Sequence, residues 1–89
     1  MTTIYKYELK TSELTELEIP AGAKVLHVNL QHGHPMLWAM VDTHAPAEKR
    51  TFCVYGTGHT IPEKANVAFI NTFFVDGGTY VFHAFELLK

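Results

Sequence analysis

The chain contains little cysteine and little arginine, and each shortage excludes a class of protein. Cys53 is the only cysteine among the 89 residues, which excludes an intrachain disulfide framework and is typical of a reducing cytosol. Arg50 is the only arginine and the net charge is −2, so the chain lacks the broad basic face needed to bind duplex nucleic acid. These counts still allow a small anionic ligand, because one or two cations and a few aimed N–H groups can hold it.

Long apolar segments are also missing. No apolar run approaches the roughly 18 residues of a membrane-spanning helix, and the first residues lack the apolar core of a signal peptide. We therefore expect a soluble, intracellular protein without membrane contact, forming a single domain over residues 1–89. Because 47% of this short chain is hydrophobic, we expect a homo-oligomer that covers part of the apolar surface.

Alternating apolar and polar residues, broken by glycine and proline, predict strands and no long helix. The expected strands cover residues 4–10, 14–19, 24–31, 36–42, 50–55, 67–75 and 79–87. We expect hairpin loops at 32–35 and 76–78, an exposed loop at 43–49 and a single helical turn at 62–66. The fold class is therefore all-β, a small antiparallel β-sandwich or barrel of six to seven strands.

The strand over residues 24–31 has the clearest alternation. It predicts two faces, one with Val25, His27, Asn29 and Gln31 and the other with Leu26, Val28 and Leu30. The polar face is either solvated or the floor of a polar site. The strands at 36–42 and 79–87 are apolar on both faces, which indicates central strands or subunit contacts.

The most distinctive stretch runs from residue 50 to residue 61. A run of β-formers leads directly into Gly56-Thr57-Gly58-His59, which offers backbone N–H groups, a hydroxyl and an imidazole. No Lys-Ser or Lys-Thr pair follows and no helix pattern begins there, so the stretch is neither a P-loop nor a dinucleotide fingerprint. Two interpretations stay open: a local anion or ribose site, or a glycine corner that His59 caps.

Catalytic and metal motifs lack required partners. His32 and His34 flank a glycine, but no carboxylate or thiol has a spacing that marks further zinc ligands. Thr57 and His59 lack an orienting carboxylate, and Cys53 lies within an apolar strand where a buried, unreactive thiol is expected. We therefore expect no catalytic residues, no metal and no cofactor, with a metal-dependent hydrolase as the weakest function class.

Several aromatic and polar residues outside the loop are candidates for ligand contact. Trp38 lies between two methionines and is the best candidate for an interface or ligand contact, while Tyr55 can stack on a base. His83 lies on an apolar side of its strand and needs a neighbouring partner. Thr72 is one candidate, across the 76–78 hairpin.

Nearly the whole chain resembles a family of small, phage-encoded proteins of uncharacterised type. The matching pieces are residues 4–7, 19–28, 37–42, 50–52, 55–61 (Tyr-Gly-Thr-Gly-His-Thr-Ile), 71–73 (Asn-Thr-Phe) and 81–86 (Val-Phe-His-Ala-Phe-Glu). The family has glycine where this chain has Asn71, which puts a close backbone approach at that position in doubt. The resemblance implies no catalytic residue, and it places the protein in the host cytoplasm.

A phage setting suggests an analogy with immune-evasion proteins that sequester the cyclic nucleotide signals of bacterial defence. The expected function is therefore an oligomeric, non-catalytic binder of a small nucleotide. The expected ligand-binding residues are Trp38, Arg50, Tyr55, Gly56, Thr57, Gly58, His59, Thr72 and His83. In this hypothesis Trp38 or Tyr55 stacks on the base, the loop holds phosphate or ribose, and Arg50 supplies charge. The alternative is a protein-interaction or virion-accessory module that acts through an apolar β surface without a nucleotide.

Overall fold

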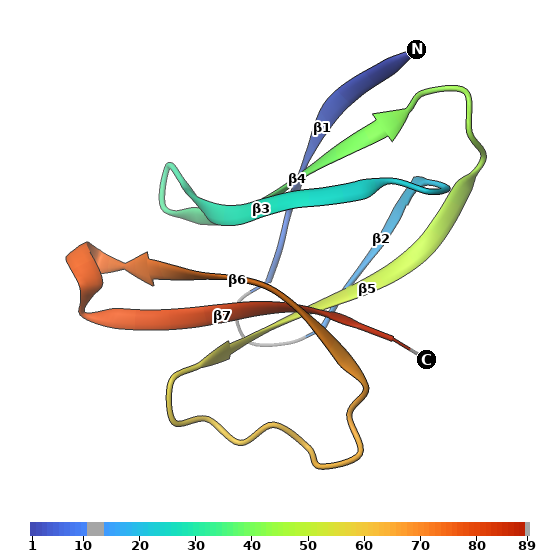
Figure 1. The fold of residues 1–89 in the computed structure, drawn as a ribbon. Coiled ribbons are helices and arrows are strands. Elements are labelled where there is room, and N and C mark those ends of the chain that lie inside the picture. Colours follow the sequence, from blue (N-terminus) through green and yellow to red (C-terminus); the bar gives the residue numbers. More distant parts are fainter. Residues whose placement is uncertain (11–13, 89) are drawn as a thin grey trace.

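A computed structural model describes residues 1–10 and 14–88 and shows an all-β fold over this range (Figure 1). Seven strands form: β1 (Thr2–Glu8), β2 (Thr15–Pro20), β3 (Lys24–Gln31), β4 (His34–Asp42), β5 (Ala47–Gly56), β6 (Val67–Val75) and β7 (Tyr80–Leu87). A short 3-10 turn, η1 (Asp76–Gly78), joins β6 to β7. The described residues include no helix long and apolar enough to cross a membrane.

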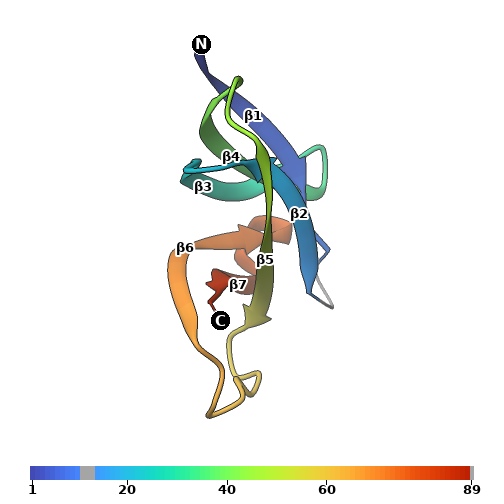
Figure 2. The same cartoon turned by 90° about the vertical axis from the view of Figure 1, so that its right-hand side faces the viewer.

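The strands form two antiparallel sheets, which confirms the expected fold class. The three-stranded sheet has the order β1-β4-β3, and the four-stranded sheet has the order β2-β5-β7-β6. The strands that are apolar on both faces, β4 and β7, have a neighbour on each side, as the sequence predicted. Strand β5 is long enough to pair with β2 through residues 47–52 and with β7 through residues 51–56. The first part of β5 therefore lies beside β2 and its last part beside β7 (Figure 2).

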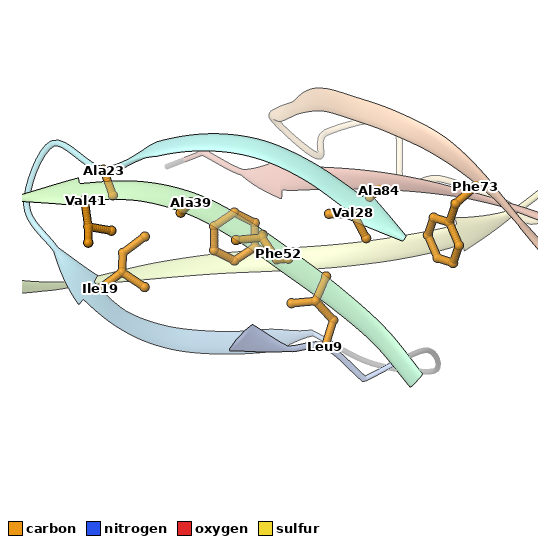
Figure 3. Close-up of a cluster of buried hydrophobic side chains, with 10 residues drawn as sticks. Leu9, Ile19, Ala23, Val28, Ala39, Val41, Phe52, Phe73 and Ala84 are labelled. Carbon is orange, nitrogen blue, oxygen red and sulfur yellow. The ribbon is translucent and has the colours of Figure 1, made fainter. Parts of the chain in front are cut away.

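The core lies between the two sheets. Phe52 of β5 occupies its middle, with Ala39 and Val41 of β4 facing Ile19 of β2 (Figure 3). Each of these four side chains is at most 1% exposed. Burying a large apolar side chain contributes about 1.5–3 kcal/mol, so this inward-facing set supplies the main stabilisation of the fold.

A side-chain amide joins the neighbouring edges of the two sheets. Asn71 of β6 accepts the Val28 N–H at its Oδ1 (2.8 Å) and donates from Nδ2 to the Val28 carbonyl (2.7 Å). Asn71 follows a bulge in β6, where the register shifts between Phe69 and Asn71. We call this pair of bonds the Asn71 seam. It satisfies both backbone polar groups of Val28, whose side chain is fully buried.

The predicted faces of β3 are partly wrong. Val25 packs against the core instead of sharing the outward side of His27 and Asn29, and Leu26 is 41% exposed. The cause is a register shift between Val25 and His27, where β3 bulges against β4. A bulge places two residues opposite one, and the alternation therefore changes side at that point.

The structure also corrects the predictions for three connecting segments. The predicted loop at 43–49 is shorter, because β5 already begins at Ala47 and its polar start pairs with β2. No helical turn forms at 62–66; the Ala65 N–H instead bonds the Pro62 carbonyl at 2.9 Å in a tight turn. The first hairpin loop contains only His32 and Gly33, both with positive φ, so His34 already belongs to β4.

Candidate functional site

The Gly-Thr-Gly-His loop is a tight corner that the His59 ring closes. The Gly56 N–H donates to His59 Nδ1 (3.2 Å), and the His59 N–H donates to the Gly56 carbonyl (3.0 Å). A Cβ on Gly56 would lie 2.8 Å from the His59 Cε1 atom, so only glycine leaves room for the ring. Because Nδ1 accepts a hydrogen bond, the neutral ring carries its proton on Nε2.

This corner uses most of the N–H groups that the sequence suggested for an anion. Gly56 and His59 bond each other, and the Thr57 N–H donates to the Val81 carbonyl at 3.0 Å. Three of the four loop N–H groups are therefore engaged within the chain. What the loop offers a ligand is mainly the edge of an imidazole.

His83 is held between two threonine hydroxyls. Its Nδ1 lies 2.9 Å from Thr72 Oγ1, and its Nε2 lies 2.8 Å from Thr57 Oγ1. Because the Thr57 hydroxyl also donates to the Val81 carbonyl (3.4 Å), Thr57 must accept from Nε2–H, and Nδ1 then accepts from Thr72. The predicted contact of His83 with Thr72 is thereby confirmed, and the chain of bonds ties the loop to β7 and β6.

A cavity of about 410 Å³ lies between this corner and the start of β7. Its lining consists of Gly56, Thr57, His59, Thr79, Tyr80, Val81 and Phe82. The volume falls within the usual range of small-molecule sites. The walls combine an imidazole, two aromatic rings and hydroxyls, and they contain no charged side chain. Tyr80 is 56% exposed, so the cavity opens to solvent beside this ring.

Arg50 lies elsewhere, in an ion pair. Its Nε and Nη2 atoms each lie 2.7 Å from a carboxylate oxygen of Glu86, and Nη1 donates to the Ala23 carbonyl (2.6 Å). The Glu86 carboxylate raises the pKa of Arg50 above its ordinary value. Arg50 precedes Gly56 by six residues on β5, roughly 20 Å along a strand, and it lines a separate groove of about 500 Å³ with Lys49 and Lys64.

The predicted site residues therefore do not all gather in one place. Gly56, Thr57 and His59 line the cavity, and Thr72 and His83 connect to it through Thr57. Tyr55 lies opposite His83 in the sheet register. Trp38 belongs to β4 in the other sheet and lines neither cavity.

The ligand-binding residues expected from the sequence did not include Thr79, Tyr80 or Phe82, which also line the cavity. Phe82 does stack on Phe73, with ring centroids 5.9 Å apart, but its other side reaches the cavity. Tyr80 stays exposed because it is the first residue of β7, directly after the hairpin loop. That position in the sequence was the available signal, since a strand-end side chain is covered by fewer neighbours.

Cys53 is buried, as predicted, with 4% of its surface exposed. Burial raises the pKa of its thiol, against a smaller lowering by the Tyr55 hydroxyl. A thiol with a raised pKa is a poor nucleophile at neutral pH. Among residues 1–10 and 14–88, no three His, Cys, Asp or Glu side chains are grouped to hold a metal ion.

Gly56→Ala should destabilise the protein by about 1–3 kcal/mol, because the new methyl group overlaps the His59 ring. Gly56 has no positive φ, so backbone strain does not contribute. In a His59→Ala background the same change should cost less than about 1 kcal/mol. Urea unfolding of the four proteins in this double-mutant cycle measures the coupling.

Gly58→Ala is the matched control for that cycle. Gly58 has a φ of 88° and nothing near its missing Cβ, so alanine there is strained whatever residue 59 is. Its cost should be the same with and without the His59 ring. Equal coupling at both glycines would contradict the proposed contact.

The whole chain, residues 1–89, matches the model of a family described as a domain of unknown function (DUF7352), and the chain belongs to this family. No curated protein and no solved structure matches it.

Proposed function

We propose that this DUF7352 domain is a non-catalytic binding protein that captures a small nucleotide-type ligand at the cavity beside the Gly-Thr-Gly-His corner. The observation that carries this proposal is the cavity of about 410 Å³ itself, lined by the Gly56, Thr57 and His59 that the sequence had singled out. Binding without turnover is consistent with walls made of rings and hydroxyls.

The chemistry of the walls favours the base and ribose of a nucleotide over its phosphate. Tyr80 offers an exposed ring on which a base can stack, a contact that contributes about 1–3 kcal/mol. The Nε2–H of His59 can donate to a base or ribose oxygen. Because the lining has no cation and the loop N–H groups are largely engaged, phosphate groups would point out of the cavity.

The resemblance to phage-encoded proteins suggests a biological role for such binding. A protein that sequesters a cyclic nucleotide signal needs affinity and abundance without turnover, which agrees with a cavity lined by rings and hydroxyls. In that form the protein acts in the host cytoplasm and lowers the free concentration of the signal.

The test is an NMR titration of amide shifts with nucleosides, mononucleotides and cyclic di- and trinucleotides. At least one compound should bind with a Kd below about 10 μM and shift the amides of residues 56–59 and 79–82. Tyr80→Ala should weaken binding about tenfold or more. Tyr5→Ala, which removes another exposed tyrosine from the other sheet, should leave the affinity unchanged.

Two results would overturn the proposal. One is a panel in which nothing binds more tightly than about 10 μM. The other is binding whose shifts are confined to the groove around Arg50, which would place the ligand away from the cavity.

A second candidate is a protein-interaction or virion-accessory module that binds no nucleotide. Phe69 and Phe74, which are 60% and 62% exposed on the four-stranded sheet, favour this candidate. It predicts that the purified protein carries no nucleotide and shows no shift with any member of the panel.

A further inference from the structure

The outer side of the four-stranded sheet carries an exposed aromatic surface, which we call the aromatic face. Its members project from β5, β7 and β6 and are Tyr55, Val67, Phe69, Phe74, Val81, Phe85 and Leu87, with His83 and Thr72 among them. Phe85 makes edge-on ring contacts with Tyr55 and Phe69, at centroid distances of 5.8 and 5.6 Å. Soluble monomers rarely leave so continuous an apolar surface in water.

Charge distinguishes the aromatic face from the outer side of the other sheet. No member of the aromatic face is a lysine, arginine, aspartate or glutamate, whereas the three-stranded sheet presents Lys6 and Lys24 beside Trp38 and Met40. A two-fold contact places a surface against a copy of itself, so like charges would repel across it. A charge-free patch is therefore compatible with a second copy of this chain, and depletion of charge is typical of interface cores.

The polar groups at the centre of the face are already satisfied. His83 is bonded at both ring nitrogens, by Thr57 and Thr72, so covering it leaves no ring nitrogen without a partner. An unsatisfied polar group would cost about 1–3 kcal/mol on burial. The face can thus lose its water without that penalty.

The size of the face is adequate for a dimer. Phe69 and Phe74 each expose about 60% of their surface, on the order of 100–150 Å² each for an aromatic side chain. With the half-buried members, the face offers roughly 500 Å² from each subunit, against about 800 Å² in a standard interface. The remaining area would come from the rim, where Lys49 and Glu16 are already paired at 3.8 Å.

The aromatic face is also continuous with the cavity. Val81 belongs to both, and Thr57 lines the cavity while bonding His83 at the centre of the face. We propose that a second copy of this chain docks on the aromatic face in a two-fold dimer. This dimer does not rest on the proposed ligand site.

The oligomeric state tests the dimer without any ligand. Sedimentation equilibrium of the full chain should show a dimer at 100 μM, and Phe74→Glu should weaken it at least 100-fold. Ile4→Glu is the matched control, because Ile4 is 56% exposed on the three-stranded sheet and is not part of the face. This variant should dimerise like the parent chain, and circular dichroism should show all three proteins folded.

The outcomes separate the inference from the proposed function. A parent chain that is monomeric at 100 μM, or a dimer broken by Ile4→Glu and not by Phe74→Glu, would overturn the dimer. If Phe74→Glu fails to fold, Phe69→Ser gives the same comparison with a smaller change. If Phe74→Glu breaks the dimer but the protein binds no member of the nucleotide panel, the dimer inference stands and the proposed nucleotide site is wrong.

Discussion

Replacing Asn71 by leucine should lower the free energy of unfolding by about 2–5 kcal/mol. The side chain is similar in size, but it removes the acceptor of the Val28 N–H and the donor to the Val28 carbonyl. Val28 is fully buried, so water does not readily replace either bond. A buried backbone group without a partner costs about 1–3 kcal/mol, and the substitution leaves two of them on one residue.

Asn71→Asp separates the two bonds of the Asn71 seam. The carboxylate still accepts from the Val28 N–H, but its second oxygen faces the Val28 carbonyl instead of donating to it. We expect this variant to lose at least as much stability as the leucine variant at neutral pH, since two oxygens then oppose each other.

Asn29→Ala is the matched control for the seam. Asn29 is exposed on the same strand as Val28, and within residues 1–10 and 14–88 its side chain bonds the adjacent Leu30 N–H and no other group. Its removal should cost less than about 1 kcal/mol. Urea unfolding followed by Trp38 fluorescence gives all three values; if Asn71→Leu costs no more than Asn29→Ala, the amide does not hold the sheets together.

Local patterns predicted most of the strands. Lys24–Gln31 and Val67–Val75 were predicted to the residue, because turn-forming residues mark their ends and apolar residues fill them. The prediction for β5 failed at its start, where Glu48 and Lys49 look like loop residues. They are in a strand because β2 provides a pairing partner, and that partner is distant in the sequence.

Register was less predictable than strand position. Val25 and Leu26 exchange sides at a bulge, and nothing in the alternation of β3 marks that position. The bulge lies just before Val28, the residue that bonds Asn71 of the other sheet. That bond joins residues 43 positions apart, so the sequence of β3 alone does not predict it.

The candidate site, too, was predictable from the sequence only in part. The contact of His83 with Thr72 was predictable, since the two residues face each other across a single hairpin. The sequence did not predict that Trp38 lies away from the loop, because that depends on which sheet β4 joins. The ion pair of Arg50 was not predictable for a similar reason. Its partner Glu86 follows 36 residues later, on a neighbouring strand.

The Arg50–Glu86 pair supports the second large prediction. Glu86→Leu should lower the free energy of unfolding by about 2–4 kcal/mol, because it removes the carboxylate that bonds the guanidinium while only 19% of the Arg50 side chain is exposed. The neighbouring Lys49 pairs with Glu16 where both side chains are more than 60% exposed. Lys49→Met should therefore change stability by less than about 0.5–1 kcal/mol.

The double variant Arg50→Met with Glu86→Leu distinguishes the loss of a bond from the burial of an unpaired charge. Arg50 also donates to the Ala23 carbonyl and lies over the Phe52 ring, 5.8 Å from its centroid, and methionine restores only the packing. If the unpaired charge dominates, the double variant should be more stable than Glu86→Leu alone by about 1–3 kcal/mol. If the double variant is the less stable of the two, the Ala23 bond outweighs the ion pair, and Arg50 acts chiefly by tying β5 to the turn before β3.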